Sequence, residues 1–219
     1  MHRPRNQSQL RRRGPKREPY DRVLIVCEGS KTEPNYLREV VAHYRLSVAN
    51  VEITGDGGSA PMSVVAQAIE LFEKDPDYNA VFCVIDHDGH TTFQQALARV
   101  RDSTLNRRIG KRKIGEARFE TITSIPCFEF WILLHYGTTT APMSRYADVE
   151  PRLKAIPALA TYAKGRRGLF AVTQDLLDTA LINADRANRA AADTGTDNPT
   201  TLMPILIRYL LELATKKAR

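Results

Sequence analysis

Acidic residues follow two apolar segments of the sequence at the points where these segments end. Glu28 comes directly after residues 23–27, and Asp86 and Asp88 follow residues 81–85. Each segment precedes a helix-like stretch, so we expect parallel strands whose carboxyl ends meet at one edge, where open α/β sheets bind ligands. Carboxylates gathered there repel one another unless a cation lies between them. Oxygen ligands suit Mg²⁺ or Mn²⁺, so the pattern predicts a metal site for phosphate chemistry.

Two further charged residues lie just after Glu28. Glu33 falls in the first turn of the expected next helix, where it either points back toward Glu28 or only favours the helix macrodipole. Lys31 falls in the turn between strand and helix, where a cation could hold a scissile phosphate or balance the carboxylates. A solvated loop lysine is the alternative for Lys31. Both residues are therefore candidates for the catalytic site.

The second acidic segment contains two aspartates and two histidines. Asp86 and Asp88 are two residues apart, so an extended backbone puts both side chains on one face, where they could clamp one cation. Aspartates that only cap a turn are the alternative. His90 shares the parity of the aspartates and is a better candidate than His87 for contact with substrate or metal. A histidine that is merely exposed in a loop remains the other interpretation.

The composition is that of a globular protein that is neither secreted nor embedded in a membrane. The 219 residues fit one domain with a small appendage, and no apolar run reaches the ~18 residues that a membrane span needs. The amino-terminal segment lacks the apolar region of a secretory signal. Cys27, Cys83 and Cys127 are widely spaced, which favours reduced thiols in a cytoplasm over a zinc site with paired ligands.

The positive charge is concentrated at the amino terminus. Residues 1–19 carry a net charge of +6 out of +7 for the whole chain. They contain few apolar residues, so we expect a flexible tail. The tail either contacts nucleic-acid phosphates, with salt-sensitive binding, or serves only as a solubilising leader. Its basic residues are Arg3, Arg5, Arg11, Arg12, Arg13, Lys16 and Arg17.

The order of the expected elements predicts an α/β fold with a parallel sheet covered on both faces. We expect strands at residues 22–27, 48–54, 80–85 and 119–124, and helices at 34–44, 62–74, 92–100 and 127–136. Residues 101–116 mix charges and glycines and are expected to be exposed. After residue 148 the patterns predict only helices, at 168–192 and 203–214. The expected parts are a tail (1–19), an α/β domain (20–147) and a helical extension packed on it (148–219).

One acid interrupts the apolar helix expected at residues 127–136. Leaving the Glu129 carboxylate buried without a partner would cost several kcal/mol, on the order of the usual penalty for a buried charge. Glu129 therefore either pairs with a cation or faces the candidate site.

Several of these segments resemble known families. Glu28-Gly29 with Asp86-x-Asp88 resembles the Toprim domain of topoisomerases, primases and old-family nucleases. Residues 27–36, residues 124–136 and the run 198–201 resemble the RloB family more closely, although Ile125 stands where that family usually has Asn. RloB proteins are named from genes within restriction–modification loci and are implicated in phage defence alongside an ATPase.

The resemblance implies a Toprim-like (Rossmann-like) sheet, with Glu28 as general acid/base that also contacts metal, and Asp86 and Asp88 as Mg²⁺ ligands. Strand passage and primer synthesis need further modules that this chain does not offer, which leaves a nuclease acting on RNA, tRNA included, or on DNA. The implied partners are nucleic acid and an ATPase encoded nearby, and a homo-oligomer stays open. The alternative is a non-catalytic module that binds nucleic acid or the ATPase.

Two other α/β classes fit the sequence poorly. A receiver domain would place its pair of acids after the first strand and a single aspartate after the third, which is the reverse of the order found here. A dinucleotide-binding domain would place G-x-G-x-x-G after the first strand, and the sequence there does not contain it.

Overall fold

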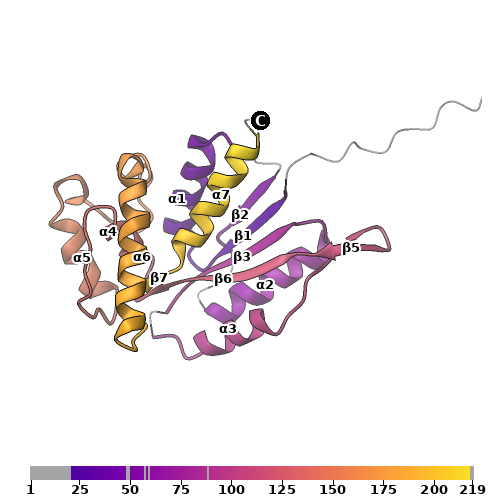
Figure 1. Cartoon of the computed structure of the whole chain (residues 1–219), viewed down its shortest axis with the longest axis horizontal. Helices are drawn as coiled ribbons and strands as arrows, with labels where there is room; N and C mark the ends of the chain where they lie inside the picture. The colour runs from indigo at the N-terminus through magenta and orange to yellow at the C-terminus, as the bar shows by residue number, and fades with distance from the viewer. Residues whose placement is uncertain (1–20, 48–49, 57, 59, 88, 218–219) are drawn as a thin grey trace, which may run out of the picture.

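A computed structural model describes residues 21–47, 50–56, 58, 60–87 and 89–217. Its centre is a five-stranded sheet in the order β2-β1-β3-β6-β7 (Figure 1). The first four strands are mutually parallel, and β7 pairs antiparallel with the end of β6. The strands are β1 (Val23–Cys27), β2 (Val51–Thr54), β3 (Ala80–Asp86), β6 (Arg118–Ile125) and β7 (Thr200–Thr201). The expected α/β fold with a mostly parallel, Rossmann-like sheet is confirmed.

Helices cover both faces of the sheet. One face packs against α1 (Thr32–His43) and α7 (Met203–Lys217), and the other packs against α2 (Pro61–Lys74) and α3 (Phe93–Arg101) (Figure 1). The wholly apolar β1 serves both sides, because alternate residues of a strand point to opposite faces. Its odd-numbered residues belong to the core beneath α1, and its even-numbered residues belong to the core beneath α2.

The remaining helices lie beyond the carboxyl ends of the strands (Figure 1). They are α4 (Glu129–Leu133), α5 (Tyr146–Lys154) and α6 (Leu177–Asp193), with 3₁₀ turns at Pro157–Leu159 and Gln174–Leu176. Their buried apolar side chains join the same core cluster as α1 and α7. The helical region therefore closes over the carboxyl edge of the sheet. The division of the chain at residue 148 stays a prediction.

Three local expectations were wrong, and one pair of strands was not expected. Residues 106–116 are mostly exposed, as expected, but they also form a two-stranded hairpin, β4 (Asn106–Ile109) and β5 (Arg112–Glu116). The helix expected at 127–136 is reduced to α4, and the one expected from residue 168 begins only at Leu177. The carboxyl-terminal region also contains β7, so it is not helical throughout. These elements depend on pairing and packing partners that a local hydrophobic pattern does not reveal.

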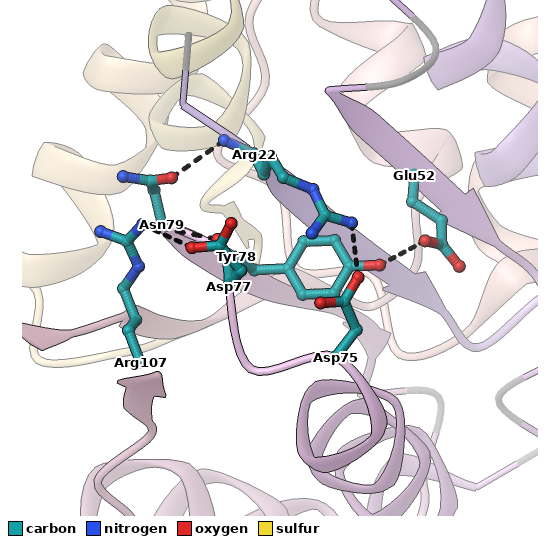
Figure 2. A network of polar contacts seen from close by, with 7 residues as sticks. All are labelled: Arg22, Glu52, Asp75, Asp77, Tyr78, Asn79 and Arg107. Atoms are coloured by element: carbon teal, nitrogen blue, oxygen red, sulfur yellow. Dashed lines mark hydrogen bonds and ion pairs between the residues drawn. The ribbon is translucent and has the colours of Figure 1, made fainter. Parts of the chain in front are cut away.

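A polar network lies at the amino edge of the sheet, which is opposite to the carboxyl edge (Figure 2). The Arg22 guanidinium donates to Asp75 at 2.8 Å and lies 4.5 Å from the centroid of the Tyr78 ring. The Arg22 backbone N–H donates to Asn79 Oδ1 at 3.0 Å, and the Tyr78 hydroxyl donates to Glu52. The loop between α2 and β3 thereby holds the beginnings of β1 and β2.

The hairpin is anchored at this same amino edge. Arg107 of β4 donates to Asp77 Oδ1 at 3.3 Å (Figure 2). β6 begins two residues after β5 and runs eight residues to the carboxyl edge, which separates the hairpin from that edge by about 25 Å.

In the described part of the chain, no helix is both long and apolar enough to cross a membrane.

Candidate functional site

Glu28 lies where β1 ends and joins the ends of two neighbouring strands. Its backbone N–H donates to the Val84 carbonyl at 3.0 Å and so continues the pairing of β1 with β3. Its Oε2 accepts a hydrogen bond from the Asp86 backbone N–H at 3.1 Å. Its Oε1 lies 3.1 Å from His90 Nε2, and the side chains of Glu28 and His90 are 11% and 36% exposed. A nearly buried carboxylate thus contacts an imidazole that is open to solvent.

Glu33 turns back from the first turn of α1 toward the end of β1. It is buried, and its carboxylate packs so closely on Gly29 that a Cβ atom at position 29 would overlap with Glu33 Oε2. Burial, together with repulsion from Glu129 and Glu28, raises the pKa of Glu33 to about 7, although a backbone hydrogen bond and Lys164 act in the opposite direction. The sequence left open whether Glu33 points back toward Glu28 or only favours the helix macrodipole. In the structure its side chain points back toward the end of β1 and the other acids.

Asp86 is the last residue of β3 and lies among the same acids. Loss of water around its carboxylate, followed by repulsion from Glu33 and Glu129, raises the pKa of Asp86 well above its usual range. A hydrogen bond from the Phe128 backbone acts in the opposite direction. Asp88, the second half of the predicted pair, lies outside the described residues, as do all the basic residues of the predicted tail.

Glu129 begins α4 and is only 2% exposed. Its Oε1 accepts a hydrogen bond from the Tyr162 hydroxyl at 2.7 Å. Because it also repels Glu33 and Asp86, Glu129 belongs to the same group of acids. Glu28, Glu33, Asp86 and Glu129 are named the acidic cluster below.

The two histidines of the β3–α3 loop face different neighbours. The turn after β3 is closed by the His90 backbone N–H, which donates to the His87 carbonyl at 2.8 Å. This turn places the His90 imidazole against Glu28, whereas the His87 ring packs edge-on against Phe93 with ring centroids 4.8 Å apart. Only His90 therefore lies where it can act together with the acidic cluster.

The region after α5 supplies residues that the sequence did not suggest as site candidates. Tyr162 contacts Glu129, and Lys164 interacts electrostatically with Glu33. Lys31, which the sequence did suggest, is exposed and lies against the same region, because a Cβ atom on Gly165 would be 3.0 Å from Lys31 Cδ. The signal in the sequence was the run Tyr-Ala-Lys-Gly-Arg-Arg-Gly at residues 162–168, which contains three cations and two glycines.

Hydrogen bonds among polar residues of β6, β7 and α6 stabilise the carboxyl end of β6. The Ser124 hydroxyl lies 3.0 Å from the Thr201 hydroxyl, and both side chains are buried. Asn188 of α6 donates to the Thr201 carbonyl at 2.8 Å and accepts from the Thr201 backbone N–H at 3.0 Å. The Asn-Pro-Thr-Thr run at 198–201 is thus part of the scaffold that holds the end of β6.

The donors of the acidic cluster fit a hard divalent cation. They are carboxylate oxygens, which Mg²⁺ and Mn²⁺ prefer, and a cation would offset the repulsion that raises the pKa of Glu33 and of Asp86. Within the described ranges, no three His, Cys, Asp or Glu side chains already form a metal-binding group. The thiols are poor candidates because all three are buried, and burial raises the pKa of each.

Comparison with known proteins identifies a family for this chain. Searches of curated proteins and of solved structures found no significant match. The family model described as RloB-like protein matches residues 23–210, a range that begins at β1 and ends within α7. The chain therefore belongs to the RloB-like protein family.

Proposed function

We propose that this protein is a divalent-metal-dependent phosphodiesterase that cleaves nucleic acid. The observation that carries the proposal is the acidic cluster, which brings together carboxylates from β3, α1, α4 and the residue after β1, at the edge of the sheet where α/β proteins bind ligands. Cleavage of a phosphodiester requires charge stabilisation at the phosphate and a group that moves a proton. The cluster offers ligands for a cation and, in Glu28, a carboxylate next to an imidazole.

Asp86 is the residue best placed to hold Mg²⁺ or Mn²⁺, together with Glu28 and with Asp88 as the sequence predicts. When bound, such a cation activates water and stabilises the negative charge that develops on the phosphate. Asp86 is fixed at the end of β3, where its own backbone N–H also holds Glu28 at 3.1 Å. One strand end thereby sets the positions of both carboxylates.

Glu28 and His90 are suited to move the proton. The 3.1 Å contact between Glu28 Oε1 and His90 Nε2 lets the carboxylate orient the imidazole and accept or return a proton. Glu33, with a pKa of about 7, changes its protonation state near neutral pH. Lys31 is exposed at the edge of the cluster, where its ammonium group can attract the scissile phosphate.

Membership in the RloB-like family guides the choice of substrate and partner. We propose RNA, tRNA included, or DNA as the substrate, and a role in antiphage defence together with an ATPase encoded nearby. The site of action would be the cytoplasm. The second candidate function is a non-catalytic module that binds nucleic acid or the ATPase on the same scaffold. It is favoured by the finding that no metal-binding group is preassembled among the described residues.

Metal-dependent cleavage separates the two functions. The purified full chain is incubated with pooled tRNA and with plasmid DNA, in Mg²⁺, in Mn²⁺ and in chelator, with and without the neighbouring ATPase. We expect cleavage that requires the cation and that falls by roughly 10²–10⁴ in Glu28→Gln, the contribution typical of a general acid or base. Substrate binding should be retained, because Gln keeps the size of the side chain and removes a negative charge.

Glu73→Gln is the matched control for this substitution. Glu73 is an exposed acid on α2, so its replacement makes the same chemical change away from the acidic cluster. Its cleavage rate should equal that of the wild type. Wild-type protein that binds the nucleic acids but cleaves none of them, under every metal and partner condition, would favour the binding module instead.

A further inference from the structure

The loop that follows Tyr162 carries an unusual concentration of positive charge. Residues 163–168, named the basic loop, contain Lys164, Arg166 and Arg167 and no acid. The loop is enclosed by two buried residues, Tyr162 and Leu169. Lys164 and Arg167 are exposed, and Arg166 is half-buried. The loop is therefore anchored in the core at both ends, and Lys164 and Arg167 are accessible to a ligand.

Hydrogen bonds fix the first half of the basic loop to the beginning of α1. The Gly165 backbone N–H donates to Thr32 Oγ1 at 2.8 Å, and the Asn35 side chain donates to the Gly165 carbonyl at 3.4 Å. Gly165 has φ +82°, a conformation that favours glycine, and its Cα faces the Lys31 side chain. Thr32 lies next to Glu33, so this anchor sets the loop beside the acidic cluster.

Glu39 fixes the second half of the loop. Its Oε1 accepts from the Gly168 backbone N–H at 2.6 Å, and its Oε2 accepts from the Phe170 backbone N–H at 2.8 Å. Charge-assisted hydrogen bonds of this kind are about twice as strong as neutral ones. The backbone that carries the three cations is thus held at both halves by α1, and little further ordering is needed when a ligand binds.

The cations of the loop lie next to the acidic cluster. Lys164 interacts electrostatically with Glu33 and offsets part of the rise in the pKa of that carboxyl, and its ammonium group lies 4.3 Å from the centroid of the Tyr146 ring. Tyr162, immediately before the loop, holds Glu129. The acidic cluster alone repels a polyanion, so a substrate with several phosphates needs cations of this kind close by.

We propose that the basic loop binds the backbone phosphates of the nucleic-acid strand on which the acidic cluster acts. This inference rests on the proposed function and names the surface that holds its substrate. Arginine suits the task because its planar guanidinium donates two parallel hydrogen bonds to a phosphate. Arg166 and Arg167, two adjacent arginines on a fixed backbone, would hold successive phosphates, while Lys31 and Lys164 attract the strand at the edge of the cluster.

The hairpin is another exposed basic segment of the described residues, and it fits this role less well. Two of its cations are engaged by acids, Arg107 by Asp77 and Lys113 by Glu116. It also lies at the amino edge of the sheet, about 25 Å from the carboxyl edge.

The exposed Arg108 and Arg112 of the hairpin therefore provide a matched control for Arg166 and Arg167.

The test measures the binding of a short fluorescein-labelled single-stranded RNA, and of DNA with the same sequence, by fluorescence anisotropy over a range of salt concentrations. Ca²⁺ replaces Mg²⁺ in these experiments. It supplies a hard divalent cation, and binding is measured before the nucleic acid is cleaved. Arg166→Gln with Arg167→Gln should weaken binding roughly 25-fold in ~0.1 M salt and reduce the slope of log affinity against log salt by about 1.4, as the loss of two phosphate contacts predicts. Comparing the RNA with the DNA shows which backbone is preferred.

Two other variants separate charge from structure. Arg166→Lys with Arg167→Lys keeps the charge and should retain most of the salt slope, although Arg166 also reaches the Ala158 carbonyl at 3.5 Å. Arg108→Gln with Arg112→Gln makes the same charge change in the hairpin and should leave affinity close to that of the wild type. Equal loss of affinity in the hairpin and loop variants, or unchanged affinity in the loop variant, would overturn the proposal.

Cleavage measured on the same preparations distinguishes this inference from the proposed function. If the wild type cleaves and the loop variant cleaves and binds equally well, the loop proposal fails and the proposed function stands. If no variant cleaves but only the loop variant loses affinity, the binding surface stands and the enzymatic proposal fails. Wild-type protein that binds neither the RNA nor the DNA would overturn both.

Discussion

Glu28 connects three parts of the candidate site through one carboxylate. It follows β1, accepts from the backbone at the end of β3 and contacts His90 in the loop beyond. The sequence predicted its position because the apolar run before it is a recognisable buried strand. The preference for His90 over His87 came from side-chain parity in an extended segment. The structure brings His90 to Glu28 by a turn instead, so parity was the wrong physical reason.

Glu33 makes the stability of the cation-free protein depend on pH. Its pKa is about 7 in the folded protein, against about 4.3 in an unfolded chain. The protonated carboxyl therefore favours the folded state. This contribution to stability is fully present below the pKa of the unfolded chain, and it is lost as pH rises through the folded-state pKa of about 7. At ~1.4 kcal/mol per pKa unit, Glu33→Gln should gain up to roughly 4 kcal/mol over the wild type above that pH.

Urea unfolding in chelator, at about pH 5 and about pH 8, measures this difference. The advantage of Glu33→Gln should be large at the higher pH and much smaller at the lower one, which lies only just above the unfolded-state pKa. A carboxylate-to-amide change on the surface, Glu73→Gln, should show no such pH dependence. An advantage of Glu33→Gln that is equal at both pH values would mean that the pKa of Glu33 is not raised by folding.

Glu129 shows what a single residue in a sequence can and cannot reveal. A charge within an apolar helical segment predicted a partner or a site, because an unpaired buried carboxylate is costly. The partner Tyr162 lies 33 residues later in the chain. No local pattern connects the two, since the contact forms only after α5 and the following turn pack against α4.

At the scale of elements, the turn from β1 to α1 depends on a glycine of the neighbouring strand. Gly55 follows β2, and a Cβ atom there would lie 2.7 Å from the Gly29 carbonyl oxygen, 2.7 Å from Pro34 Cγ and 2.8 Å from Ser30 Cα. Two of these neighbours are backbone atoms that cannot rotate away. Gly55→Ala should therefore displace the turn that carries Glu28 and cost about 1–3 kcal/mol of stability, as overpacking typically does.

Thermal unfolding and cleavage assays of Gly55→Ala test this dependence. Gly137→Ala is the matched control, because a Cβ atom there meets nothing within 4 Å. The control should keep its stability and activity, whereas Gly55→Ala should lose part of both. If Gly55→Ala were as stable and as active as the control, the close packing of Gly55 on the turn between β1 and α1 would not matter for function.

The elements that the sequence predicted well are those with a strong pattern of their own. β1 and β3 are continuous apolar runs, and α2 has apolar residues at helical spacing along its buried face. The hairpin was missed because most residues of β4 and β5 are charged, so no alternation of apolar and polar residues marks them. β7 has only two residues and exists through its pairing with β6.

At the scale of the whole molecule, the two edges of the sheet have different roles. The amino edge is closed by the network around Arg22 (Figure 2) and carries the hairpin (Figure 1), whereas the carboxyl edge carries the acidic cluster. The helical region after α4 packs over the carboxyl edge and adds the basic loop beside it. The sequence predicted the acids near strand ends, but not this arrangement, because it depends on contacts across more than 120 residues.

Binding of a divalent cation by the acidic cluster is the claim on which the account depends. Calorimetric titration of Mn²⁺ into the full chain measures it directly, with Asp86→Asn as the test and Asp193→Asn, an exposed acid at the end of α6, as the control. We expect the wild type and the control to bind Mn²⁺ alike, and Asp86→Asn to bind at least about tenfold more weakly. Wild-type protein that binds no Mn²⁺, or an Asp86→Asn variant that binds it as tightly as the wild type, would contradict the account.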